Sequence, residues 1–298
     1  MNKLLFIFLD GVGLGKDEDI NPIKDLFKPM TGRKFLLDSY PLITEDLLLK
    51  PIDAVLGVDG IPQSATGQTS IMTGVNAQKL LGHHHTAFPN EPLIDLIKEL
   101  NLLKAVKDLG FTATCANMYS TEYFEKRSAR VKNMFPVSAL SIRYSDTPYR
   151  FIADYNNQEA VFADITNNVI KSRGYDIDII TPEVAADNML NICNKNDFVF
   201  FEYFITDTYG HKKKREELLN EVDKLNRFIK SIWNNGDNGV DIILTSDHGN
   251  CEDISTGNHT TNPVPFLFIS KNQKLKDEFY SKVASLTDFK EAVINYFT

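Results

Sequence analysis

The sequence has few cysteines and no long hydrophobic run, and each shortage excludes a class of protein. Its 298 residues include three cysteines, Cys115, Cys193 and Cys251. Their odd number and wide spacing match neither a disulfide framework nor a zinc knuckle, so reduced thiols in a cytoplasmic protein are expected. No segment approaches the roughly 20 apolar residues of a membrane-spanning helix. We therefore expect a cytoplasmic protein without a membrane partner.

Positive charge is also in short supply. Lysine and arginine number 32 against 40 aspartates and glutamates, which gives a formal net charge of -8. A broad basic surface for a phosphate backbone is not expected from this balance, so nucleic acid is excluded as the predicted partner. An acidic protein can still bind an anionic substrate where bound metal ions reverse the local field.

The apolar run at residues 4–9 predicts a strand rather than a signal peptide. The run is short, ends at Asp10, and is followed by no small-residue cleavage site. Continuous apolar residues are typical of a strand buried on both faces of a parallel sheet. Further strands are predicted at 111–116, 197–204, 240–245 and 265–269, and helices at 65–73, 92–109, 182–193 and 212–235. Strands that alternate with helices indicate an α/β fold with a mostly parallel sheet.

The middle of the chain breaks this alternation. Residues 119–180 mix aromatic, charged and short apolar stretches without a regular strand–helix rhythm. We predict that this segment is a small inserted cap, and that residues 1–118 and 181–298 together form the core domain.

Metal-ligating residue types occur where the predicted strands end. Ligands of open α/β sheets bind beyond the carboxyl ends of the strands, so these positions are where chemistry is expected. Carboxylates and imidazoles together suit Zn²⁺, Mn²⁺ or Fe²⁺. The chain has six histidines, and three of them fall at these positions. The candidate ligands are Asp10, Asp207, His211, Asp247, His248 and His259.

Each of these positions has a plainer explanation when taken alone. Asp10 and Gly11 are typical of an ordinary turn after a strand, and Asp207 could cap the helix that follows. Asp207 and His211 are four residues apart, a spacing that places both on one side of a helical turn. The joint occurrence of all six at strand ends favours a metal site over independent accidents.

Ser64 is the candidate nucleophile at the start of the predicted helix 65–73. Serine is also a favoured helix N-cap, so a purely structural role is the alternative. The two roles are compatible, because a helix N-terminus favours negative charge and would lower the pKa of a hydroxyl there. Thr66 and Thr69 are neighbouring alternatives that spacing does not exclude.

Charge counting favours two metal ions. Asp10, Asp207, Asp247 and an ionised Ser64 carry four negative charges, and two divalent cations carry four positive ones. Such a site is formally neutral and can accept a phosphate dianion, which the bare carboxylates would repel. Two ions about 3.5–4 Å apart can stabilise both the attacking oxygen and the transferring group.

The whole set of motifs resembles the metalloenzyme branch of the alkaline phosphatase superfamily, which includes cofactor-independent phosphoglycerate mutase and phosphopentomutase. The resemblance rests on Asp10-Gly11, Ser64-x-x-Gly67, Asp207-x-x-Gly210-His211, Asp247-His248-Gly249-Asn250 and the run from His259 to Pro265. It implies a three-layer sandwich with a small cap, and two divalent ions, Mn²⁺ or Zn²⁺. One ion would be held by Asp207, His211 and His259, and the other by Asp10, Ser64, Asp247 and His248. Ser64 aligns with the residue that becomes phosphorylated in those mutases.

Two departures from that family matter: the first weakens a transfer of the mutases' substrate specificity, and the second favours hydrolysis over a mutase reaction. Gln68 stands where the mutases carry a histidine after Gly67. The room for a cap, about 60 residues between 119 and 180, is much less than in the mutases. A mutase must exclude water from the phosphoserine, and a closing lid is the usual device. A small cap leaves hydrolysis as the easier outcome.

Three hypotheses therefore follow. The favoured one is a phosphatase- or phosphodiesterase-type hydrolase that acts on a small phosphorylated substrate through Ser64. The second is a phosphomutase with the same first half-reaction, and the third is a non-catalytic metal-binding protein. His83, His84 and His85 form a run after the nucleophile helix and are predicted to line the substrate pocket or donate a proton, with a polar loop as the alternative. The oligomeric state has no signal in the sequence.

Overall fold

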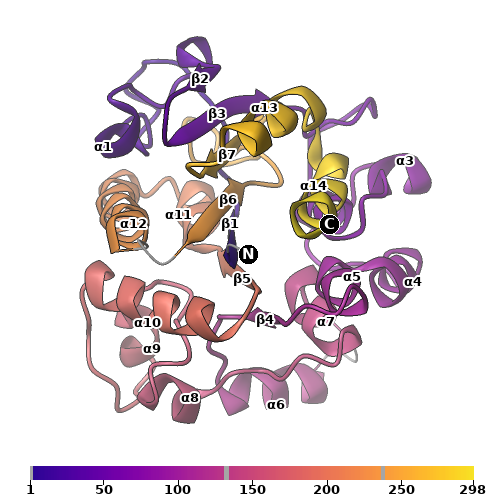
Figure 1. The fold of residues 1–298 in the computed structure, drawn as a ribbon, viewed down its shortest axis with the longest axis vertical. Coiled ribbons are helices and arrows are strands. Elements are labelled where there is room, and N and C mark those ends of the chain that lie inside the picture. Colours follow the sequence, from indigo (N-terminus) through magenta and orange to yellow (C-terminus); the bar gives the residue numbers. More distant parts are fainter. Residues whose placement is uncertain (1–2, 131–133, 236–238) are drawn as a thin grey trace.

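A seven-stranded sheet forms the centre of the protein (Figure 1). The computed structural model describes residues 3–130, 134–235 and 239–298. The spatial order of the strands is β2-β3-β7-β6-β1-β5-β4. Their bounds are β1 (Lys3–Leu9), β2 (Leu42–Ile43), β3 (Leu47–Ile52), β4 (Ala113–Cys115), β5 (Phe198–Tyr203), β6 (Val240–Thr245) and β7 (Val264–Ile269).

Strand β1 occupies the middle of the sheet, as its continuous apolar run predicts. It pairs in parallel with β5 on one side and β6 on the other, so Leu5 lies beside both Val199 and Ile242. Strand β4 adds in parallel to β5, whereas β7 runs antiparallel to β6 and to β3. The predicted α/β fold with a mostly parallel sheet is confirmed.

Helices cover both faces of this sheet and make three layers (Figure 1). Leu5 and Ile7 pack in the core beneath α10 and α12, while Phe6 and Phe8 face the opposite layer, which includes α4, α5, α7 and α14. The helices are α1 (Lys28–Thr31), α2 (Ser64–Thr73), α3 (Ala77–Leu81), α4 (Glu91–Leu100), α5 (Leu102–Asp108), α6 (Thr121–Arg130), α7 (Val137–Tyr144), α8 (Ile152–Asn156), α9 (Asn168–Ser172), α10 (Pro182–Lys195), α11 (Ile205–His211), α12 (Arg215–Asn235), α13 (Gln273–Lys282) and α14 (Phe289–Phe297), with 3-10 helices η1 (Leu37–Ser39) and η2 (Leu286–Asp288).

Two predicted helices differ from the observed ones in where they break or begin. The helix expected over 92–109 is two helices, α4 and α5, and the break lies at Asn101, whose side chain accepts a hydrogen bond from the backbone N–H of Lys104. Asn101 thereby caps α5. The helix expected from 212 begins at Arg215, and a separate helix, α11, precedes it.

The described part of the segment predicted as a cap contains short helices joined by turns and loops. Residues 119–130 and 134–180 contain α6 to α9 and no strand, and residues 131–133 lie outside the described residues. Helix α7 packs on α4 and α2 of the core. A small apolar cluster of its own joins Phe162, Ile170 and Ile177 to Met118. The domain boundaries at 118 and 181 stay a prediction.

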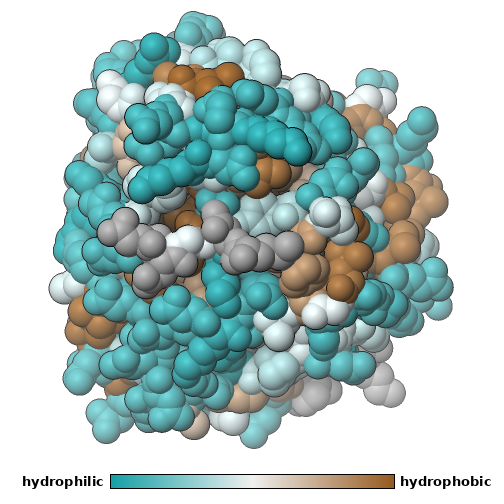
Figure 2. Space-filling view, in the orientation of Figure 1, coloured by the Kyte–Doolittle hydropathy of each residue, from teal (hydrophilic) through white to brown (hydrophobic). Residues whose placement is uncertain are grey.

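The surface shown in Figure 2 is mostly hydrophilic, with hydrophobic patches at the top, near the centre and, most extensively, on the right. None of the helices in the described ranges has the length and apolar character needed to cross a membrane.

Candidate metal centre

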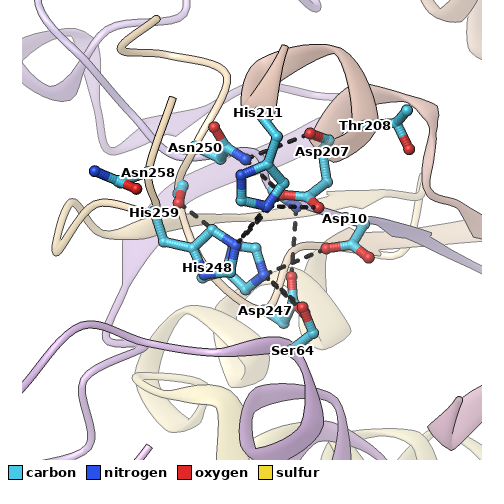
Figure 3. Close-up of polar contacts among 12 residues, drawn as sticks. Asp10, Ser64, Asp207, Thr208, His211, Asp247, His248, Asn250, Asn258 and His259 are labelled. Carbon is cyan, nitrogen blue, oxygen red and sulfur yellow. Dashed lines mark hydrogen bonds and ion pairs between the residues drawn. The ribbon is translucent and has the colours of Figure 1, made fainter. Parts of the chain in front are cut away.

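The predicted ligands come from different elements that meet at one edge of the sheet. Asp10 follows β1, and Asp247 and His248 follow its neighbour β6. Asp207 and His211 lie on α11, which begins after β5 on the other side of β1. Because β7 is antiparallel to β6, the loop that leads into β7 and carries His259 reaches the same edge. Figure 3 shows these side chains, together with Ser64, pointing toward one another.

One set of side chains, called here the outer group, comprises Asp207, His211 and His259. The Nε2 atoms of the two histidines are 3.1 Å apart. The Asp207 carboxylate lies 3.3 Å from His211 Nε2 and 3.6 Å from His259 Nε2. Ligand atoms at about 2.1 Å from a tetrahedrally bound Zn²⁺ lie roughly 3.4 Å from each other, so this spacing fits a metal ion.

The second set, called here the inner group, comprises Asp10, Ser64, Asp247 and His248. His248 Nε2 lies 3.0 Å from the Ser64 hydroxyl oxygen and 3.4 Å from a carboxylate oxygen of each aspartate. The two groups adjoin, because the rings of His248 and His259 stack with their centroids 3.6 Å apart. The structure thus brings together all seven predicted ligands.

The histidine tautomers favour metal ligation by Nε2. The Nδ1 atom of His211 lies 2.9 Å from the backbone oxygen of Gly257, and that of His259 lies 2.9 Å from the backbone oxygen of Pro62. A carbonyl oxygen only accepts, so Nδ1 donates a proton in both rings and Nε2 is the atom that each ring turns toward the other ligands.

Burial and like charge act strongly on the inner group. Burial raises the pKa of Asp10 well above its usual value, and the nearby carboxylate of Asp247 raises it further. Burial and then the charge of Asp207 raise the pKa of Asp247 to about 8. Burial lowers the pKa of His248 to about 3, so its ring is neutral and able to ligate. One oxygen of Asp10, Oδ1, is buried without a hydrogen-bond partner, which a bound cation would satisfy.

The outer group is electrostatically different. Burial raises the pKa of Asp207, but the hydrogen bond from His211, the positive charge of that ring and the Asn250 amide outweigh it and hold that pKa at about 2. The same bond raises the pKa of His211 to about 9. In the metal-free protein this pair is an ion pair, and a metal must displace the proton of His211.

Ser64 is the first residue of α2. It therefore stands one position after the N-cap, the position that serine often occupies. The cap is Gln63. The neighbouring alternatives are engaged within the helix, since the hydroxyl of Thr66 donates to the backbone oxygen of Gln63 and that of Thr69 to the backbone oxygen of Ala65. Of these three hydroxyls, only that of Ser64 faces the metal ligands.

Two polar residues that the sequence did not single out as functional hold the ligands in place. Gln68 Nε2 donates to Asp247 at 3.2 Å and to Asp10 at 3.4 Å. Buried Glu252 accepts hydrogen bonds from the backbone N–H groups of Gly13 and Asn250 and from the side chains of Thr260 and Asn262, so it ties together the loops after β1, after β6 and before β7. Only its nearness to the Asp247-His248 string could have pointed to Glu252.

Close approach explains two glycines of the motifs. Gly11 has a positive φ of 71°, and a Cβ there would lie 2.6 Å from Asp207 Oδ1. A Cβ at Gly67 would lie 2.8 Å from Asp247 Cβ. Any other residue at either position would displace a ligand.

The three histidines predicted to contact substrate lie outside the lining of the cavity beside the metal ligands. That cavity reaches Ala87 and Phe88 of the same loop. His83 Nδ1 lies 3.1 Å from the backbone oxygen of Leu81, and His84 Nε2 lies 3.0 Å from that of Val58. The backbone N–H of His85 donates to Thr66. Their predicted substrate role stays a prediction.

Comparison with known proteins agrees with the motifs. The family model described as the metalloenzyme superfamily matches residues 2–298. A 2,3-bisphosphoglycerate-independent phosphoglycerate mutase of Gracilaria tenuistipitata is 33% identical over 111 residues, which cover 33% of this chain and 21% of the relative. Another, from Antithamnion, is 23% identical over 223 residues, covering 70% of this chain and 38% of the relative. The chain therefore spans between a fifth and two fifths of the length of these curated relatives.

Among solved structures, the cold-active alkaline phosphatase of a psychrophilic Shewanella has the same fold. It aligns with a TM-score of 0.60 at 10% identity over 99% of this chain and 100% of its own. At that identity the likeness speaks for the fold alone, and the predicted alkaline-phosphatase-like architecture is confirmed.

Proposed function

Because the chain belongs to the metalloenzyme superfamily, we propose that it is a metal-dependent enzyme that transfers a phosphoryl group from a small phosphate ester to Ser64 and then to water. One observation carries this proposal. The Ser64 hydroxyl, on the first residue of a helix, lies 3.0 Å from His248 within the inner group. A nucleophile at this position has metal ligands on one side and a helix N-terminus behind it.

The inner and outer groups would each hold one divalent ion, Mn²⁺ or Zn²⁺, since their donors are nitrogen and oxygen atoms that suit both. The chemistry such ions supply is Lewis acidity, which stabilises charge on the attacking and leaving oxygens. The donor set fits that role, given the converging Nε2 atoms and the unpartnered oxygen of Asp10.

The protein's own residues perform the remaining work. Ser64 Oγ forms the new bond to phosphorus while the alcohol of the ester leaves, and water then cleaves the phosphoserine. The N-terminus of α2 offers backbone N–H groups that favour negative charge on the nucleophile and on the phosphate. Gln68 keeps the two inner carboxylates in position through its bonds to both.

Hydrolysis is the proposed outcome because the cap segment is small. A mutase is the second candidate, and the curated relatives favour it, since they are phosphoglycerate mutases. Both reactions share the transfer to Ser64. They differ in whether water or a second hydroxyl of the substrate receives the phosphoryl group.

The test is phosphorus NMR of the Mn²⁺-loaded protein with a panel of sugar phosphates, phosphoglycerates and phosphodiesters. Growth of inorganic phosphate, or of a monoester from a diester, supports hydrolysis. Conversion of one ester into its isomer without free phosphate supports the mutase and contradicts the hydrolase.

The variant that tests the nucleophile is Ser64→Ala, and Thr66→Ala is its matched control. Removal of the Ser64 hydroxyl abolishes turnover and leaves metal in the outer group, whereas Thr66→Ala keeps turnover. Normal turnover in Ser64→Ala contradicts the proposal. A protein that binds metal tightly but transfers phosphate from no ester in the panel supports the non-catalytic hypothesis instead.

A further inference from the structure

A cavity of about 260 Å³ opens beside the inner group. Asp10, Ser64 and Gln68 form one end of it. The rest of its described wall comes from the loop after α3, from the end of β5, and from the segment between β4 and α10. A phosphate bound at Ser64 would therefore extend its organic part into this cavity.

Aromatic and aliphatic side chains make up most of this wall. Phe204, at the end of β5, is 37% exposed although it stands only three residues before Asp207. Phe162 of the cap segment, Met118 just before that segment, and Phe88 from the loop after α3 also line the cavity. Apolar surface that is open to water gains free energy when an apolar group covers it.

Positive charge is scarce on the same wall. Arg173 is the one cation among the lining residues that the structure describes. Two other arginines of the cap segment are engaged elsewhere: Arg150 donates to the backbone oxygen of Cys115 and to Thr114, and the Arg143 guanidinium lies 4.3 Å from the centre of the Phe135 ring.

A buried carboxylate adds negative charge at this place. Glu202 lines the cavity, is 7% exposed, and accepts a hydrogen bond from the Ser138 hydroxyl at 2.5 Å. A second anionic group on a substrate, such as the carboxylate of a phosphoglycerate, would therefore meet a like charge in an apolar surrounding, which is unfavourable.

We propose that the alcohol part of the substrate is uncharged and apolar, so that the enzyme acts on hydrophobic phosphate esters rather than on phosphoglycerates. The proposal rests on the proposed function for the position of the phosphate. Phe204, Phe162, Met118 and Phe88 select the substrate by covering its apolar part. Glu202 selects against substrates that carry a second negative charge.

Binding and turnover are measured separately so that the two proposals can fail separately. Calorimetry of the Mn²⁺-loaded protein compares 2-phenylethylphosphonate with 3-carboxypropylphosphonate, neither of which can be hydrolysed. Kd is expected to be at least about tenfold lower for the phenyl compound, in line with the worth of a few methylene groups in an apolar pocket. Equal or tighter binding of the carboxypropyl compound overturns the inference.

Turnover is compared for 2-phenylethyl phosphate, glycerol 3-phosphate and 3-phosphoglycerate, which are all esters of primary alcohols. The expected order of kcat/KM is the order in which they are named. Turnover that is fastest with 3-phosphoglycerate overturns the inference but leaves phosphoryl transfer intact. Tighter binding of the phenyl phosphonate without turnover of any ester supports the inference and contradicts the proposed function.

Two variants assign the selectivity to the wall. Phe204→Ala is expected to raise Kd for 2-phenylethylphosphonate about tenfold and to leave that for 3-carboxypropylphosphonate unchanged. Leu80→Ala, at a residue that is exposed outside the cavity, is the control, and melting temperatures verify that both variants fold. Arg173→Gln is expected to raise the Kd values of both phosphonates by the same factor. A loss confined to the carboxypropyl compound assigns Arg173 to a second anion and contradicts the inference.

Discussion

The inner and outer groups use similar ligands in contrasting surroundings. The side chains of Asp247 and His248 are fully buried at the end of a central strand, whereas the His211 side chain is 45% exposed on the short helix α11. Burial and like charge hold protons on the inner carboxylates, while the outer Asp207 is ionised and paired. Without metal the inner carboxylates are therefore protonated, whereas the outer group contains an ion pair.

This contrast assigns different tasks to the two groups. Buried ligands such as Asp247 and His248 make electrostatic stabilisation strong, and Ser64 lies beside them at the end of the cavity. The outer group, in which the His211 side chain is open to solvent on a short helix, is expected to exchange its ion more readily. We expect loss of the inner ion to stop the reaction, and loss of the outer ion to be reversible by added metal.

Replacement of Asp247 by asparagine is expected to give the largest effect. The substitution keeps the shape of the side chain but removes a buried negative charge from the inner group. Turnover should fall at least about 1000-fold, because a Lewis-acid ion contributes several kcal/mol to the transition state. Elemental analysis should find one fewer bound ion. Asp253→Asn is the matched control, since Asp253 bonds within its own loop to Ser255, and a similar loss in both variants contradicts the account.

His211→Gln is expected to give a smaller and reversible effect. It removes one ligand from the outer group, where solvent already reaches the side chain. The affinity of the outer group for Mn²⁺ should fall about 10- to 100-fold, which is the loss typical of replacing a residue that supports a metal site. Turnover should return at high Mn²⁺ concentration. Lys212→Gln, on the next residue, controls for charge at the end of α11. Turnover that no metal concentration restores would remove the distinction between the two groups.

Gln68→Leu tests whether a hydrogen bond to the inner carboxylates affects metal binding in the inner group alone. The leucine cannot donate to Asp10 or Asp247, so both carboxylates lose one orienting hydrogen bond. We expect about a tenfold loss of metal affinity in the inner group, typical for residues that orient ligands, and no change in the outer group. Gln68→His keeps a donor and should recover part of the loss. Unchanged affinity in Gln68→Leu would show that the amide has no positioning role.

Metal removal should matter more as pH rises. In the metal-free fold the pKa values of Asp10, Asp247 and His211 are all raised, to about 8 for Asp247 and about 9 for His211. Groups with raised folded-state pKa values contribute stability at low pH that is lost as pH climbs through those values. Between pH 7 and pH 9 the other ligands do not titrate, because the pKa of Asp207 is about 2 and those of His248 and His259 are lowered.

The expected result is that the difference in Tm between Mn²⁺-loaded and metal-free protein widens by a few degrees from pH 7 to pH 9. Bound cations keep the carboxylates ionised, so the loaded protein does not suffer the same loss. Differential scanning calorimetry at both pH values measures it. A constant or shrinking difference contradicts the protonated state of the inner carboxylates.

The sequence was sufficient to predict the strands that carry the site, because a buried strand is recognised from its own apolar residues. Strand β6 was predicted with its observed bounds at 240–245, since a buried strand between parallel neighbours is a continuous apolar run. Ligand positions then followed from the rule that sites lie at strand ends. Asp10 at the end of β1 and Asp247 at the end of β6 were predicted by this rule.

What the sequence did not reveal depends on contacts between distant residues. Strand β3 was missed because Lys50 and Pro51 interrupt its apolar pattern, although Lys50 is accommodated by donating to the backbone oxygen of Tyr280. Glu252 and Gln68 act through partners far along the chain, and residue types alone carry no sign of such pairing. The cavity wall is formed by Phe204 and Phe162 from separate segments, so its apolar character appears only in the fold.

The most direct test of the central claim is the steric course of the reaction at phosphorus, measured with an isotopically chiral phosphate ester and an alcohol acceptor. Transfer through Ser64 requires two in-line displacements, so the account predicts net retention of configuration. Net inversion would mean that the acceptor attacks the ester directly, and it would contradict a phosphoserine intermediate.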